Sequence, residues 1–399
     1  MVAMALTRMR GRDWRFVTTV VAGILWFCFF GNGEAYRFDT TNADRHGWIV
    51  RSEDAAGWRG WAPGDTLAWT LDTSADWSKW FGSSAGARRV IEQALTAWSD
   101  LPNADISWEV AGEAASDYGD RGPRERRSRN WVSIDPNGEF GGQARSWWRF
   151  SGSVWRRSAC TVVGGSWLAR EPPDGWRELD EDDPDRLYPG LGVWIHEFGH
   201  CLGLGHSQRL PTNSLRVRGE FDERRERHNS YPVFQSDRWR ADPQMSYGWS
   251  DFGLEHPVAA DDAVGATLLR PARGWLRTVG AISGSVHLDG RPVRYAHIWA
   301  FPAEAMPKGR QPGPVGVFSD RDGNFLIEGL APGLYVLWVS PMTERPAHHR
   351  LSGLAGPSVL DETLLPYPIR VTAGSVTDEI SIPLRRGREC RPPAPCGKP

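Results

Sequence analysis

Three histidines and one glutamate lie within an eleven-residue stretch, residues 196–206, that reads HEFGHCLGLGH. His196 and His200 are four positions apart, so a helix places both imidazoles on one face, about one turn from each other. Gly203 follows, and a helix ends readily there because glycine adopts positive φ at little cost. The chain can then turn and bring His206 to the same point. Three neutral imidazoles bind zinc and leave a fourth position for water, as catalytic zinc sites do.

Glu197 lies between the first two histidines and is rotated about 100° from His196 around the helix, beside the expected metal. A carboxylate there can take a proton from the water that the metal activates and pass it to a leaving amine. We therefore expect zinc-dependent hydrolysis of peptide bonds, with Glu197 as the general base. Hydrolysis of a non-peptide amide is an alternative that the motif alone leaves open. The alternative is a helix whose histidines only pack or face solvent, which the combined spacing of histidines and glycine disfavours.

The 196–206 stretch resembles the zinc motif of the metzincin superfamily of metallopeptidases. Met245-Ser246-Tyr247 resembles the Met-turn that underlies the metal in that superfamily. The resemblance implies that Met245 packs beneath the three histidines. It also implies that the hydroxyl of Tyr247 reaches the metal, as a loose ligand or as a donor to the oxyanion; a tyrosine that only packs is the alternative.

The superfamily branch stays open. Ser207 and the helix expected over residues 261–269 are similar to the matrixin branch, whereas Tyr247 matches the astacin-like and serralysin-like branches. The resemblance covers roughly residues 60–271.

Apolar periodicity indicates an α/β or α+β domain over residues 36–275, and we expect the α+β class. By the resemblance, this domain holds a twisted, mostly parallel sheet with an active-site helix and a C-terminal helix. The expected strands lie at residues 65–73, 106–110, 131–134 and around 160–163, and the expected helices at residues 85–101, 190–203 and 259–269.

Short alternating strands separated by Gly, Pro and Asp turns follow, which indicates a small all-β sandwich over residues 278–385. This segment resembles the carboxypeptidase regulatory-like, transthyretin-like domain of secreted proteins. We expect a separable module, followed by a tail at residues 386–399, and a hairpin turn at Asp320–Asn324. An alternative function is a surface-binding or adhesion protein that uses the sandwich and carries an inactive peptidase-like domain.

The N-terminus has arginines before an apolar run at residues 16–30, and small residues at 33 and 35. This layout predicts a secretory signal peptide over residues 1–35 and a secreted or extracytoplasmic protein that leaves the membrane after cleavage. An uncleaved membrane anchor is the alternative, although the run is short for a span.

Four cysteines remain after the signal peptide, an even number that indicates disulfides in an exported chain. Cys390 and Cys396 bracket a proline-rich loop and are expected to pair, which leaves Cys160 for Cys201 by elimination. A zinc-ligand role for Cys201 is the alternative, but three better ligands are present.

The formal net charge is −2, from 47 basic and 49 acidic residues. This balance points away from nucleic acid or an anionic membrane surface as the main partner. The resemblance to metallopeptidases implies a peptide or protein substrate. The acidic run Asp180–Asp185 and the turn at residues 135–138 are candidates for a calcium ion, although acidic loops are more often only solvated. The pattern does not indicate an oligomeric state.

Overall fold

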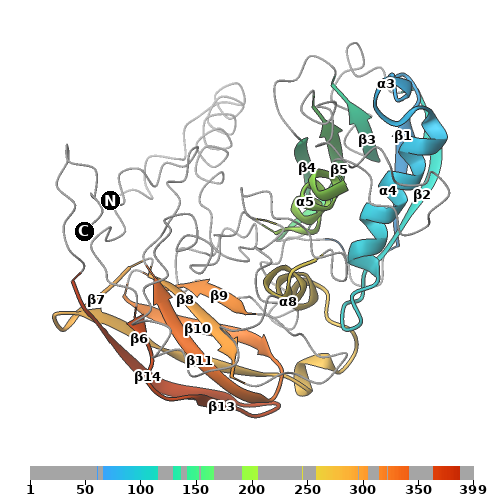
Figure 1. Cartoon of the computed structure of the whole chain (residues 1–399). Coiled ribbons are helices and arrows are strands. Elements are labelled where there is room, and N and C mark those ends of the chain that lie inside the picture. The colour runs from blue at the N-terminus through green and yellow to red at the C-terminus, as the bar shows by residue number, and fades with distance from the viewer. Residues whose placement is uncertain are drawn as a thin grey trace, which may run out of the picture. The chain divides into compact units, whose positions relative to one another are not determined.

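The structure is a computed structural model, and it describes twelve parts of the chain, all within one compact unit. These parts are residues 61, 66–115, 129–135, 142–151, 154–165, 191–204, 245, 258–294, 296–303, 314–320, 322–340 and 363–386. They form an α/β region with a mixed five-stranded sheet, followed by a β-sandwich (Figure 1).

The α/β region contains five strands and four helices in the described residues. In chain order they are β1 (Thr66–Asp72), α3 (Ser78–Phe81), α4 (Ser84–Ser99), β2 (Ser107–Ala114), β3 (Asn130–Ile134), β4 (Gly142–Ser151), β5 (Val154–Gly164), α5 (Leu191–Leu202) and α8 (Ala260–Leu269). A 3₁₀ turn, η8 (Trp275–Arg277), leads into the sandwich.

The five strands lie in the order β2-β1-β3-β5-β4. Strands β2, β1, β3 and β5 pair in parallel, and β4 pairs antiparallel to β5. Burial alternates along β1, where Leu67, Trp69 and Leu71 are buried between more exposed neighbours. Because this alternation has a period of two, one face of the sheet is covered.

Helices α4 and α5 contact each other, and each also contacts the sheet, so both pack on its covered face (Figure 1). The Ser83 side chain accepts a hydrogen bond from the backbone N–H of Gly86 and caps the start of α4. The helix buries the stripe Val90, Ile91, Leu95 and Trp98 that its sequence predicts.

The β-sandwich consists of two sheets. Its strands are β6 (Gly280–Leu288), β7 (Arg291–Pro292), β8 (His297–Pro302), β9 (Val315–Phe318), β10 (Asn324–Leu330), β11 (Gly333–Ser340), β12 (Thr363–Leu364), β13 (Ile369–Val371) and β14 (Val376–Leu384). One sheet has the order β10-β6-β14 with β7 beside β6, and the other has the order β12-β11-β8-β9 with β13 beside β11.

The element boundaries agree with the sequence expectations at most places, and the differences include α3, β4 and the turn at Asp320–Asn324. Strand β4 was not predicted, because its sequence GQARSWWRFS has no apolar alternation. The hairpin predicted at Asp320–Asn324 is wrong, since β9 and β10 belong to different sheets. The Asp320 carboxylate instead accepts hydrogen bonds from the backbone N–H groups of Asp322 and Asn324, which closes a turn between the sheets.

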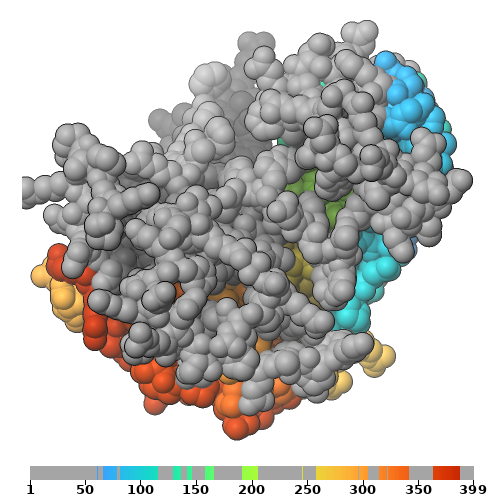
Figure 2. Space-filling view, viewed as in Figure 1, coloured from blue at the N-terminus to red at the C-terminus, as the bar shows by residue number. Residues whose placement is uncertain are grey.

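In the space-filling view, the N-terminal part of the α/β region shows in blue to cyan and the sandwich in yellow to red (Figure 2). One hydrophobic cluster runs through the buried residues of both regions. Within the described residues, no helix has the length and apolar character needed to cross a membrane.

Candidate metal centre

Helix α5 carries His196, Glu197 and His200, and the two imidazoles converge as the four-residue spacing predicts. Their Nε2 atoms lie 3.1 Å apart, and the ring planes meet at 90°. Most of α5 is buried, while both histidines keep partial exposure. Two ring nitrogens therefore face one point at the accessible side of a buried helix.

The proton position on His200 follows from its neighbour. Its Nδ1 lies 2.8 Å from the carbonyl oxygen of Leu204, which can only accept a hydrogen bond, so Nδ1 carries the proton. In the neutral ring, the Nε2 lone pair then faces His196. An outer hydrogen bond of this kind fixes the tautomer and the ring orientation of a metal-binding histidine.

This pair fits a zinc ion. A tetrahedral zinc with Zn–N bonds of about 2.0–2.1 Å holds two ligand nitrogens about 3.3–3.4 Å apart. The observed 3.1 Å between the Nε2 atoms is close to that separation. Within the described ranges, no group of three or more His, Cys, Asp or Glu side chains gathers around a common point. His196 and His200 would hold the metal, and the predicted third ligand, His206, lies outside these ranges.

The end of α5 agrees with the expected role of Gly203. The helix ends at Leu202, and Gly203 has φ of 122°. Its backbone N–H donates to the carbonyl of Gly199 at 3.2 Å, and the N–H of Leu204 donates to the same carbonyl at 3.0 Å. The turn satisfies the last helical carbonyls and brings the Leu204 carbonyl to His200.

Glu197 is buried, with 6% of its surface exposed. Burial raises the pKa of its carboxyl group to about 8, while a hydrogen bond from the backbone N–H of Ala144 acts in the opposite direction. A nearby cation favours the charged form of a carboxyl group and so lowers its pKa. The pKa of Glu197 therefore depends on whether a cation is bound beside it.

Strand β4 lies directly over Glu197. A Cβ atom at Gly142 would stand 2.6 Å from Cγ of Glu197 and 2.6 Å from Cγ1 of Val193. Side chains do not approach so closely, so only glycine lets the β4 backbone come this near α5. The same approach allows the N–H of Ala144 to reach the carboxylate.

Met245 lies against the other side of the helix. It is fully buried, and a Cβ atom at Gly199 would collide with its Sδ atom and would also stand 2.9 Å from the Trp98 ring. Gly199 lies between His196 and His200 in the sequence, so Met245 supports α5 within the turn that carries both histidines.

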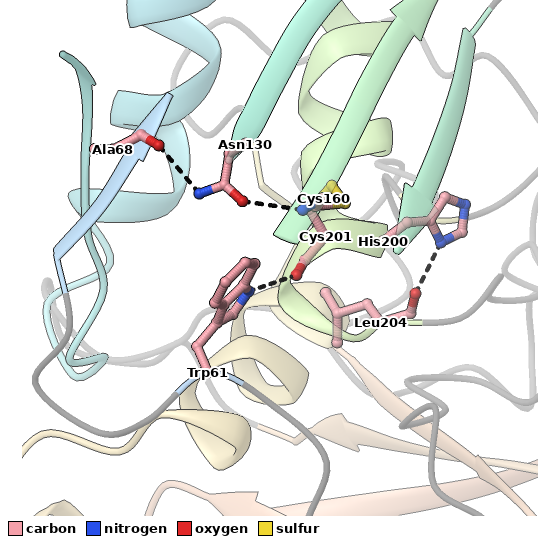
Figure 3. Close-up of a disulfide and its surroundings, with 7 residues drawn as sticks. All are labelled: Trp61, Ala68, Asn130, Cys160, His200, Cys201 and Leu204. Carbon is pink, nitrogen blue, oxygen red and sulfur yellow. Dashed lines mark hydrogen bonds between the residues drawn. A yellow bond between two sulfur atoms is a disulfide. The ribbon is translucent and has the colours of Figure 1, made fainter. Parts of the chain in front are cut away.

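Two indoles and one disulfide hold α5 in place. Trp98 donates from Nε1 to the carbonyl of Ile195, and Trp61 donates to the carbonyl of Cys201, both at 2.9 Å. The predicted disulfide between Cys160 and Cys201 is present, with Cα atoms 5.8 Å apart, and joins β5 to the last turn of α5 (Figure 3). These contacts fix both ends of the segment that carries the histidines.

Several predicted residues lie outside the described ranges. They are His206, Tyr247, Cys390, Cys396, the acidic run Asp180–Asp185 and residues 136–138 of the turn named as a calcium candidate. Sequence reasoning missed the contributions of Gly142, Ala144, Trp61 and Trp98, because each acts through backbone approach or an indole N–H rather than through a motif.

Sequence reasoning also gave no role to the two carboxylates at the start of α8. Asp262 accepts a hydrogen bond of 3.4 Å from the backbone N–H of Met245, and so links α8 to the residue under the histidines. The available signal was the Asp261-Asp262 pair in the first turn of a predicted helix, where carboxylates are favoured.

No protein-family model matches the chain, and no curated protein matches it. Distant likeness is found among the solved structures, for example to the following three proteins. The TIE protein of Bacillus anthracis shares 14% identity over 27% of this chain and 17% of its own, with a TM-score of 0.19. The minor pilin GBS52 of Streptococcus agalactiae shares 14% identity over 30% of this chain and 49% of its own, with a TM-score of 0.18.

The major pilin subunit BcpA of Bacillus cereus shares 16% identity over 28% of this chain and 31% of its own, with a TM-score of 0.18. The chain therefore spans less than half of each of these three proteins. Likeness at this level does not bear on the chemistry of α5.

Proposed function

We propose that this chain is an exported zinc-dependent endopeptidase of the metzincin type. The observation that carries the proposal is the convergence of the His196 and His200 Nε2 atoms, 3.1 Å apart, beside the buried carboxylate of Glu197. The sequence motif supplies His206 as third ligand and Met245 as the residue beneath the site. Zinc bound there supplies a Lewis acid that activates water and polarises a carbonyl group.

Glu197 moves the proton in this proposal. Its carboxylate takes a proton from the attacking water and delivers it to the nitrogen of the leaving amine. The N–H of Ala144 holds the carboxylate in a fixed orientation, which favours proton transfer along one direction. His196 and His200 bind the metal as neutral rings and do not exchange protons in the reaction.

Strand β4 supports a peptide as the substrate. Among the described residues it is the last strand of the order β2-β1-β3-β5-β4, and it runs antiparallel to β5. An edge strand can pair with an extended peptide through backbone hydrogen bonds. A peptide bound there would pass close to Glu197, because Gly142 and Ala144 of β4 already contact that side chain.

Export is supported by the N-terminal segment and by the disulfide. The Cys160–Cys201 bond is of a kind that forms and persists in oxidising compartments.

The test compares Glu197→Gln with His200→Ala in the full chain, by zinc content per chain and by digestion of a peptide library with mass-spectrometric readout. Glu197→Gln should keep one zinc and lose about 10²–10⁴-fold in kcat. His200→Ala should lose both zinc and activity. Equal loss of zinc in the two variants would contradict the assigned roles.

The second candidate function, surface binding by the β-sandwich beside an inactive peptidase-like domain, makes the opposite prediction. The zinc-loaded wild-type chain would leave the whole peptide library intact. The same library experiment therefore separates the two.

A further inference from the structure

Helix α8 has no exposed face. All nine residues from Asp261 to Leu269 are buried, including two aspartates and a threonine. A surface helix buries one stripe and leaves the opposite side to water, whereas a helix buried all round is part of a core. In the described residues, α8 packs against the α/β region on one side and against the β-sandwich on the other.

The α/β region supplies one set. Helix α8 contacts α5, and a Cβ atom at Gly203, just after α5, would make ordinary contact with Cδ1 of Leu269 at 3.6 Å. On this side Asp262 accepts from the backbone N–H of Met245.

The β-sandwich supplies the other set. Helix α8 contacts β9 and β10. Gly329 of β10 lies so close to it that a Cβ atom there would stand 2.6 Å from Cγ1 of Val264. Asp261 accepts a buried hydrogen bond of 2.8 Å from the backbone N–H of Gly316 in β9.

The hydrogen bond from Gly316 to Asp261 has two effects. Strand β9 ends the order β12-β11-β8-β9, so the N–H of Gly316 belongs to a sheet edge that Asp261 covers. The bond also fixes the first turn of α8, where the next residue, Asp262, reaches Met245. The adjacent carboxylates of Asp261 and Asp262 thus connect strand β9 of the sandwich to Met245, which packs against α5.

We propose that the β-sandwich is a structural part of the metal centre, with Asp261 as the positioning residue that connects them. The chain of contacts runs from Gly316 through Asp261 and Asp262 to Met245, which lies against α5 at Gly199. This inference rests on the proposed metal site. It is an alternative to the expectation from the sequence that the sandwich is a separable module.

The test uses three variants of the full chain: Asp261→Ala, Asp261→Asn and Asp289→Ala. Asn keeps an oxygen that accepts from the N–H of Gly316, and Ala does not. Asp289→Ala is the matched control, because it removes an exposed sandwich carboxylate that pairs with Arg386 at 2.7 Å. Each variant is measured by competition for zinc with a chelator and by the absorption spectrum of the cobalt-substituted protein. Neither readout needs a substrate.

Asp261→Ala should weaken zinc binding about threefold to tenfold, as expected for the loss of one buried hydrogen bond, and should change the cobalt spectrum. Asp261→Asn and Asp289→Ala should resemble the wild type. A folded Asp261→Ala protein with wild-type zinc affinity and an unchanged cobalt spectrum would overturn the proposal. A failure to cleave any peptide would count against the proposed function and leave this result in place.

Hydrogen exchange of the wild-type chain covers the case in which Asp261→Ala does not fold. Peptides that contain Met245, α8 and β9 should open together, with the same dependence on low denaturant concentrations. If the free energy of opening of the Met245 peptide differed clearly from that of the β9 peptide, the two regions would be independent modules and the proposal would be refuted.

Discussion

Replacing both Cys160 and Cys201 by alanine should remove a large part of the stability of the α/β region. The two cysteines are 41 positions apart and fully buried, and their bond ties β5 to the helix that carries the histidines. In the chain-entropy model, a cross-link that closes a loop of this length stabilises the folded state by about 4 kcal/mol at 25 °C. The double substitution should lower the free energy of unfolding by that amount.

Urea unfolding, followed by tryptophan fluorescence on the zinc-loaded protein, measures this loss. With an m-value of about 2–3 kcal/mol/M, the midpoint should fall by about 1.3–2 M urea. Treating the wild type with a reductant should produce a similar fall, and the same reductant should have little further effect on the variant. A midpoint shift below about 0.5 M would refute the assignment of this stability to the disulfide.

Three further predictions concern Gly199 in α5, Tyr247, and His297 in the core of the sandwich. Gly199→Ala should lower zinc affinity and stability by about 1–3 kcal/mol, because the added methyl group collides with Met245. Tyr247→Phe should reduce kcat about 10²-fold with little change in KM, if its hydroxyl donates to the oxyanion. Burial lowers the pKa of His297 from 6.5 to about 3. Below pH 6.5 the unfolded chain therefore binds a proton at His297 that the folded chain excludes. The free energy of unfolding should fall as the pH drops from 6.5 towards 3, by about 2 kcal/mol at pH 5.

Chelator competition and urea unfolding report on Gly199→Ala, with Gly112→Ala as the control, because a Cβ atom at Gly112 has no neighbour within 4 Å. Steady-state kinetics report on Tyr247→Phe, and a normal kcat would leave Tyr247 as a packing residue. Urea midpoints between pH 7 and pH 5 report on His297, and His297→Leu should remove the part of the pH dependence that this residue causes. An equal pH dependence in that variant would contradict its role.

The features predicted well from the sequence are local ones. The four-residue spacing of His196 and His200 fixes their position on a helix, and Gly203 ends that helix because of its own backbone freedom. The stripe of α4 follows from periodicity in the same way. Such features depend on residues close in the chain, so the sequence alone is enough to place them.

The features that were missed depend on residues far apart in the chain. Strand β4 has no apolar alternation of its own and is recognised only by its pairing with β5. The need for glycine at 142 becomes evident only when Glu197 is placed opposite it. Helix α8 was predicted as a helix, but its burial on every side depends on strands that follow it in the chain.

The burial of α8 also bears on how the chain is made. The helix leaves the ribosome before residues 315–330, which form the strands that cover it. Until those residues arrive, Val264 and its apolar neighbours have no sandwich to bury them, and the first turn lacks the partner of Asp261. A nascent chain that stops before β9 would therefore leave the apolar side chains of α8 without cover, so α8 reaches its buried environment only after most of the polypeptide has been synthesised.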